Sequence, residues 1–145
     1  METAIIVTFR VEGFHQWKDA KKYSDEVEFL SNHHRHMFHF KMWKSVEEDD
    51  REIEIILFKR KAIKAIKEEW GMPAQFGNLS CEQIAKILIE KLELDSCQVL
   101  EDGENGAVVW RGKEEREHEY ASLEELENVL FDNLDEESWK DTNSS

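Results

Sequence analysis

The sequence lacks the features that mark a secreted or membrane-spanning protein. It has two cysteines, Cys81 and Cys97, and no Cys-x-x-Cys motif, so it offers no disulfide framework. No apolar run approaches the roughly 18–20 residues of a membrane span. The start Met1-Glu2-Thr3 lacks the basic and apolar stretches of a signal peptide. These absences predict a cytoplasmic protein that has no membrane partner.

Basic side chains are also scarce relative to acidic ones, and the net charge is −14. Residues 101–145 hold 15 acidic and 4 basic side chains, whereas residues 1–100 hold 18 and 15. Affinity for nucleic acid comes largely from clustered Lys and Arg, so this composition argues against a nucleic-acid partner. It does not exclude a small phosphorylated or purine-like ligand held in a pocket.

The 145 residues, 40% of them hydrophobic, are enough for one domain with a core. We expect residues 1–112 to form this domain and residues 113–145 to form an acidic C-terminal helix and tail. Within that segment, residues 122–131 place apolar side chains on one side of a helix, and residues 132–145 have no periodicity.

Periodicity predicts grouped strands and helices, and grouping of this kind favours the α+β class with an antiparallel sheet. Ser80 and Gln83 have the spacing of a capping box at the start of the second helix. The predicted strands cover residues 3–11, 33–46, 51–58, 97–100 and 107–110, the helices cover 59–70 and 81–92, and residues 16–26 and 74–79 are loops.

Four of the six histidines lie within residues 33–40. No Gly or Pro interrupts this stretch, which is typical of a strand. Residues two apart on a strand share a face, so His34 and His36 lie on the same face as Phe38, Phe40 and Met42, which should pack into the core. Two such imidazoles have Cβ atoms about 6.5–7 Å apart and can reach one metal ion.

A zinc site needs at least one more protein ligand, and His15 at the end of the first strand is the obvious donor. Neutral imidazoles bind metals, so we expect affinity to fall below about pH 6. The alternative remains open at this point, because a lone His-x-His pair is more often a hydrogen-bonded structural feature than a set of metal ligands.

Three motifs within residues 7–109 together resemble the family of 6-pyruvoyl-tetrahydropterin and 6-carboxytetrahydropterin synthases. Residues 9–15, Phe-Arg-Val-Glu-Gly-Phe-His, look like the family's first strand, which ends in a zinc-binding histidine. Residues 34–38, His-Arg-His-Met-Phe, look like its His-Gly-His-Asn-Tyr strand, which supplies two more ligands. Residues 78–85, followed by 99–107, look like its second helix and the following hairpin.

The resemblance implies a tunnelling fold, with an antiparallel sheet of four to five strands and two helices on one face. In that fold the sheets of several subunits close into a barrel, often as a trimer or a hexamer, and ligands bind between subunits. It also implies a Zn²⁺ ion held by His15, His34 and His36.

In this family a hairpin glutamate recognises the pterin or purine ring, and Glu101 is the matching residue. Cys81 and Glu82, in the second-helix motif, are the other candidate ligand-binding residues. Asp102 and Glu104, which stand beside Glu101 in the turn, are expected to matter much less.

The sequence departs from the family at its catalytic residues. The family's catalytic cysteine precedes the His-Gly-His strand, but residues 27–32 contain no cysteine. Its Asp-His pair leads to the second helix, but residues 68–76 contain no histidine. Proton abstraction therefore has no obvious base, and Tyr23, His33 and His39 are weak substitutes.

Two hypotheses follow from the motifs and the departures. The first is a divergent zinc-dependent synthase that acts on a pterin or a deazapurine. The second, which the missing residues favour, is a non-catalytic protein of the same fold that sequesters a pterin, a nucleotide or a nucleotide messenger.

Overall fold

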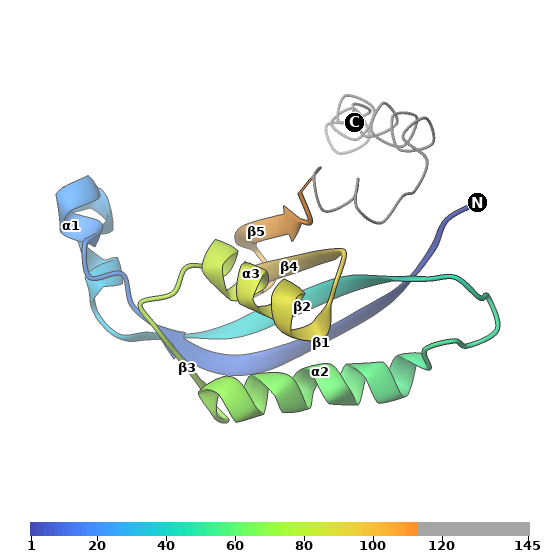
Figure 1. The fold of residues 1–145 in the computed structure, drawn as a ribbon. Helices are drawn as coiled ribbons and strands as arrows, with labels where there is room; N and C mark the ends of the chain where they lie inside the picture. The colour runs from blue at the N-terminus through green and yellow to red at the C-terminus, as the bar shows by residue number, and fades with distance from the viewer. Residues whose placement is uncertain (113–145) are drawn as a thin grey trace. The chain divides into compact units, whose positions relative to one another are not determined.

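Five strands form one sheet in the computed structural model, which describes residues 1–112 (Figure 1). The strand order is β3-β1-β2-β4-β5, and every neighbouring pair is antiparallel except β1 and β3, which are parallel. The helix and tail predicted for residues 113–145 lie outside the described residues. The strands are β1 (Thr3–His15), β2 (His34–Val46), β3 (Ala74–Gly77), β4 (Ser96–Glu101) and β5 (Asn105–Trp110).

Two longer helices and two short ones complete the described part. None of the described helices is long and apolar enough to cross a membrane. The predicted second helix is confirmed over residues 81–92, and its capping box is present, since the Ser80 and Gln83 side chains bond each other's backbone N–H groups. The helices are α1 (Ala20–Tyr23), a 3₁₀ helix (Asp25–Ser31), α2 (Ile55–Trp70) and α3 (Cys81–Leu92).

The strand predicted over residues 51–58 is wrong, because α2 begins at Ile55. The Glu54 carboxylate accepts hydrogen bonds from the backbone N–H groups of Ile56 and Leu57 and so caps the helix. The alternation that suggested a strand did not mark a buried face, since the side chains of residues 55, 56 and 57 are 51%, 57% and 62% exposed. The buried residues follow helical spacing instead: Phe58, Ala62, Ala65 and Ile66.

Two segments predicted as loops contain regular structure. Residues 16–26 include α1, and residues 74–79 include β3. Ala74 and Phe76 of β3 are buried while the residues between and after them are exposed, so β3 packs one face on the core. Because β3 runs parallel to β1, the sheet is mixed rather than wholly antiparallel.

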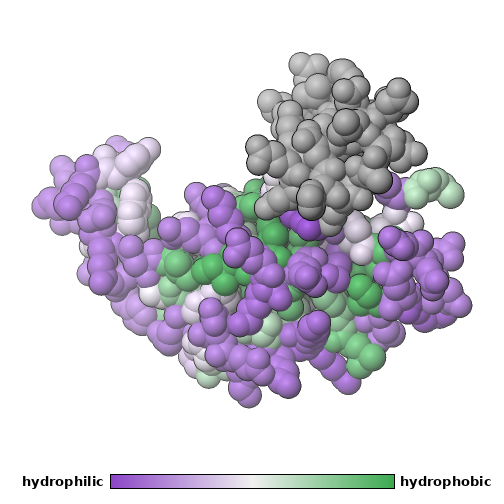
Figure 2. Space-filling view, in the orientation of Figure 1, coloured by the Kyte–Doolittle hydropathy of each residue, from purple (hydrophilic) through white to green (hydrophobic). Residues whose placement is uncertain are grey.

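The core lies between one face of the sheet and the helices α2 and α3. β1 and β2 pair along their whole length, so buried residues of the two strands stand opposite one another on this face. The predicted inward row is confirmed, with Phe38 and Met42 fully buried and Phe40 2% exposed. Burying a side chain of this size contributes about 1.5–3 kcal/mol. Figure 2 shows hydrophilic residues over most of the outer surface in that view.

The β4–β5 hairpin depends on a turn that few residue types can form. Asp102 and Gly103 have φ values of 55° and 73°, in the left-handed region that Asp and Gly tolerate better than most residues. Gly106 allows β5 to lie against β4, because a Cβ there would stand 1.9 Å from the Val99 carbonyl oxygen. The turn also bonds to β2, since the Asp102 N–H donates to the Met37 carbonyl at 2.8 Å.

Candidate metal centre and adjoining cavity

Three histidines meet where β1 ends and β2 begins. His15 stands directly opposite His34 in the antiparallel register, and His36 follows two residues later on the same face of β2. The ring centroids are 4.6 Å apart for His15 and His34, 5.3 Å for His15 and His36, and 4.9 Å for His34 and His36. The cluster therefore follows directly from the strand pairing.

One ring nitrogen of each histidine lies within 4.8 Å of those of the other two, so this set can hold a metal ion. A tetrahedral zinc with Zn–N bonds of about 2.0–2.1 Å needs nitrogens roughly 3.3–3.4 Å apart.

Two of the rings use Nδ1 to bond a backbone carbonyl. His15 Nδ1 lies 3.1 Å from the Leu79 oxygen, and His34 Nδ1 lies 2.7 Å from the Asn32 oxygen. A carbonyl oxygen can only accept a hydrogen bond, so Nδ1 carries the proton in both rings. In the neutral imidazole this leaves a lone pair on Nε2, the nitrogen available to a metal.

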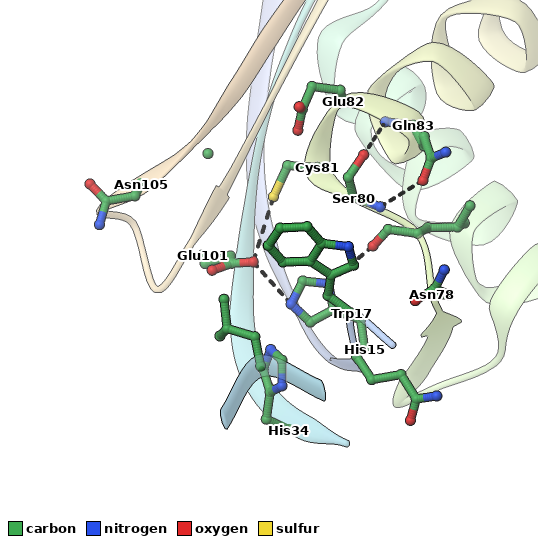
Figure 3. Close-up of a pocket in the computed structure, with 14 residues that line it drawn as sticks. His15, Trp17, His34, Asn78, Ser80, Cys81, Glu82, Gln83, Glu101 and Asn105 are labelled. Atoms are coloured by element: carbon green, nitrogen blue, oxygen red, sulfur yellow. Dashed lines mark hydrogen bonds and ion pairs between the residues drawn. The ribbon is translucent and has the colours of Figure 1, made fainter. Parts of the chain in front are cut away.

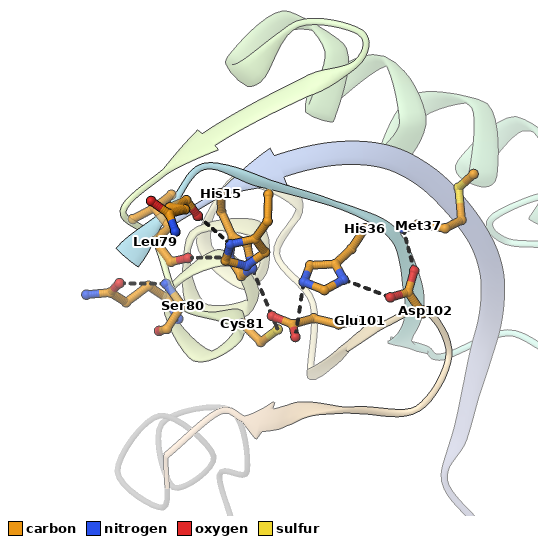
Figure 4. Close-up of polar contacts among 11 residues, drawn as sticks. His15, His36, Met37, Leu79, Ser80, Cys81, Glu101 and Asp102 are labelled. Atoms are coloured by element: carbon orange, nitrogen blue, oxygen red, sulfur yellow. Dashed lines mark hydrogen bonds and ion pairs between the residues drawn. The ribbon is translucent and has the colours of Figure 1, made fainter. Parts of the chain in front are cut away.

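The third ring is held in the same way by a carboxylate. His36 Nδ1 donates to Asp102 Oδ2 over 2.7 Å, and the other carboxylate oxygen, Oδ1, accepts the backbone N–H of Met37 at 2.9 Å (Figure 4). The hydrogen bond from the Met37 N–H is the main reason that the pKa of Asp102 is lowered, and the hydrogen bond from His36 is the next largest cause. Histidines that bind metals commonly donate their other ring nitrogen to a carbonyl or carboxylate in this manner.

The Nε2 atoms of His15 and His36 are buried and lack a hydrogen-bond partner among the described residues. Glu101 Oε2 lies 2.9 Å from His15 Nε2, and Glu101 Oε1 lies 3.5 Å from His36 Nε2. Both are ion-pair contacts, which are favourable when the ring is protonated. Buried ring nitrogens with free lone pairs are what a zinc ion requires, so the donor set fits the metal.

Burial and neighbouring charges shift the pKa values of the cluster's members in different directions. Burial alone lowers the pKa of His15, but the Glu101 carboxylate and the Leu79 carbonyl outweigh it, and the net pKa is raised. The His15 contact lowers the pKa of Glu101 although burial opposes it. Burial is the main reason that the pKa of His34 is lowered.

A cavity of about 540 Å³ adjoins the cluster, a size suited to a small ligand (Figure 3). The structure brings five of the six candidate site residues to its wall, and His36 lies beside it in contact with Glu101. The candidate residues that line the cavity are His15, His34, Cys81, Glu82 and Glu101.

The thiol in this wall is poorly suited to act as a nucleophile or a base. Cys81 is buried, and its Sγ lies 3.9 Å from Glu101 Oε2. The pKa of Cys81 is raised to about 12, mainly by burial and next by the charge of Glu101. A thiol with such a pKa stays protonated near neutral pH, so it supplies almost no thiolate.

The three substitute bases considered from the sequence lie outside the wall of this cavity. Tyr23 is 80% exposed and packs beside Trp17, with ring centroids 5.5 Å apart. His33 stacks on Phe14 at 5.1 Å. The third, His39, lies against the turn at residue 103. None of the three is among the described residues that line the cavity.

Sequence reasoning missed the partners that orient the rings. Asp102 was expected to matter little, yet it bonds His36 directly. The Leu79 carbonyl, which holds His15, has no side-chain signal at all. Trp17 and Asn78 also line the cavity. The role of Asp102 could have been suspected from the sequence, because it stands in a tight turn beside Glu101. An Asp in such a turn can reach a neighbouring strand.

Comparison with known proteins identifies the fold. No protein-family model matches the sequence, and no curated protein matches it. Among solved structures, this structure is similar to that of the 6-pyruvoyl tetrahydropterin synthase of Caenorhabditis elegans, with a TM-score of 0.57 and 13% sequence identity. The match covers 77% of this chain and 97% of that chain.

The chain has a fold like that of 6-pyruvoyl tetrahydropterin synthase. The resemblance seen in the sequence motifs is thus confirmed at the level of the fold.

Proposed function

We propose that this protein binds zinc through His15, His34 and His36, and that it holds a pterin, a purine or a related nucleotide in the cavity beside the metal. The observation that carries the proposal is the orientation of the three rings. Each Nδ1 is bonded to an oxygen, which leaves three Nε2 lone pairs directed into one cluster. Bound zinc would supply a Lewis acid able to polarise a ligand oxygen.

Glu101 is the residue that we assign to recognition of the ligand ring. Its carboxylate lines the cavity and is partly exposed, with 30% of the side chain accessible. The lowered pKa of Glu101, due first to His15, keeps it ionised at neutral pH. An ionised carboxylate can accept two hydrogen bonds from the N–H and NH₂ groups at the edge of a pterin or guanine ring.

A second candidate function is ligand binding without catalysis. The pKa of Cys81, raised to about 12, favours it, because the thiol nearest to the proposed ligand is protonated at neutral pH. We propose on this ground that a protein of this fold and site can sequester a nucleotide or a nucleotide messenger.

Turnover and binding measurements on the zinc-loaded protein distinguish the two candidates. Turnover of dihydroneopterin triphosphate would support the synthase, whereas calorimetric binding of a pterin or a guanine nucleotide without turnover would support the binding protein. Absence of binding by every pterin and purine tested would contradict both. His34→Ala is the matched control, since it removes one proposed zinc ligand while leaving Glu101 in place.

A further inference from the structure

A second cavity lies on the described part of the chain, at residues that the proposed function does not use. Its volume is about 600 Å³, and it shares no lining residue with the cavity beside the histidine cluster. The neighbouring strands β1, β2 and β4 supply most of its wall. In this register Thr8 stands opposite Lys41, and Arg10 stands opposite His39.

Alternation places these side chains away from the core. Val7, Phe9 and Val11 are buried, so Thr8 and Arg10 between them point to the other face of the sheet. The same alternation on β2 puts His39 and Lys41 on that face, because the residues beside them are the buried ones at positions 38, 40 and 42.

Among the described residues, the wall holds three cations and no carboxylate. Arg10 and Lys41 come from the sheet, Lys59 comes from α2, and His39 stands opposite Arg10. This is unusual for a chain whose residues 1–112 hold 21 acidic and 16 basic side chains. The next residue of β1 on the same face, Glu12, does not neutralise the group, since its carboxylate already binds a different arginine.

The cationic side chains are available to an anion. Within residues 1–112, no hydrogen bond or ion pair engages the side chains of Arg10, His39 or Lys59, and Lys41 contacts the ring of Trp43 at 5.0 Å. Gathering like charges on adjacent strands is destabilising. A bound anion would remove that repulsion.

We propose that this cavity is a second binding site, which takes the phosphate groups of a small molecule such as a triphosphate. An arginine guanidinium donates two parallel hydrogen bonds to a phosphate, and lysine supplies a compact charge beside it. Thr8 and Gln98, which also line the cavity, add uncharged donors. The proposal does not depend on zinc or on Glu101.

Calorimetric titration with inorganic triphosphate at low salt tests the site. We expect Arg10→Gln and Lys41→Gln each to weaken binding about tenfold or more, as for loss of a hydrogen bond between charged groups. Arg60→Gln and Lys86→Gln are the matched controls, because they remove the same charges from exposed positions of α2 and α3 outside this cavity. Thermal melting of each variant confirms that it is folded.

Two further measurements identify the ligand and distinguish this site from the histidine cluster. His34→Ala should bind triphosphate as tightly as the parent does. If GTP binds more tightly than triphosphate, and Arg10→Gln weakens the binding of GTP, the site takes a nucleotide. If the two bind equally, the site recognises the phosphate chain alone.

Three results would overturn the proposal. The first is no binding of triphosphate at millimolar concentration. The second is equal weakening by the control variants, which would mean nonspecific attraction to surface charge. The third is tighter binding of a single-stranded oligonucleotide than of triphosphate, which would indicate an extended polyanion instead of a small molecule.

Discussion

His36 donates a hydrogen bond from Nδ1 to Asp102 Oδ2 over 2.7 Å, and this bond joins the histidine cluster to the β4–β5 turn. The bond fixes which ring nitrogen of His36 carries the proton, and so leaves Nε2 free to face the other two rings. Asp102 itself is anchored by the backbone N–H of Met37. We therefore regard Asp102 as a positioning residue for the proposed metal site.

Asp102→Asn should weaken zinc binding by about 10–100-fold, the usual effect of losing an outer partner of a metal-binding histidine. The amide oxygen can still accept the Met37 N–H, but the NH₂ group would then face the Nδ1–H of His36. Relief of that clash requires His36 to carry its proton on Nε2, where zinc must bind. Competition with a chromogenic chelator measures the affinity.

Glu104→Gln is the control for this change, since it removes the same charge from an exposed position of the same turn. Equal zinc affinity for Asp102→Asn and the parent would mean that the His36–Asp102 bond does not orient the ring.

Glu101→Gln should weaken binding of the best pterin or guanine ligand by about 2–4 kcal/mol, because it places a donor where the ring edge needs an acceptor. The same change removes the partner of His15, so a decrease in stability is expected as well. Calorimetry on zinc-loaded protein measures the affinity, and thermal melting measures the stability. Unchanged affinity in this variant would refute the role given to Glu101.

The affinity for zinc should depend on pH mainly through His15. The pKa of His15 is raised above 6.5 in the folded protein. A proton on His15 therefore stabilises the metal-free fold below pH 6.5, and this contribution is lost as the pH rises through the raised pKa. Zinc needs the neutral ring, and therefore competes with this proton. Affinity should begin to fall above pH 6.5 on acidification, a higher pH than the value of about 6 expected from the sequence.

His34 should not limit binding in this range, because its pKa is lowered by burial. Glu101→Gln supplies the test: without the carboxylate, burial dominates at His15, and the pH of half-maximal zinc binding should move down. A midpoint that stays at the parent's pH would show that Glu101 does not set the protonation of His15.

The protein should form an oligomer, expected from the family resemblance to be a trimer or a hexamer. β3 and β5 are the edge strands of the described sheet, and natural proteins usually pair or protect such edges. Sedimentation equilibrium at micromolar concentration measures the mass. A single species at the chain mass of 17.2 kDa would contradict this expectation.

Much of the fold could be predicted from local patterns. The inward row of β2 and the cap of α3 depend on residues close together in sequence, and both are confirmed. The error at residues 51–58 arose because Ile53, Ile55 and Leu57 alternate as in a strand. The Glu54 cap and the helical burial pattern that begins at Phe58 decide the structure there instead.

The site was harder to predict, because it depends on contacts between distant segments. Pairing of β2 with β4 places Phe38 opposite Glu101, and this register brings the carboxylate to the histidines. Periodicity cannot reveal which strands become neighbours. Strand alternation brought His34 and His36 together and suggested His15, and the family resemblance added Glu101. Asp102 and the Leu79 carbonyl became apparent only in the structure.

The zinc content of protein purified without a histidine tag tests the central claim most directly. After equilibrium dialysis against buffered zinc at pH 7.5, elemental analysis should give about one zinc per chain for the parent. The His15→Ala, His34→Ala and His36→Ala variants should each retain much less, because three protein ligands are the usual minimum for a tight site. A folded parent that binds no zinc, or three variants that bind as much as the parent, would contradict a metal centre at these histidines.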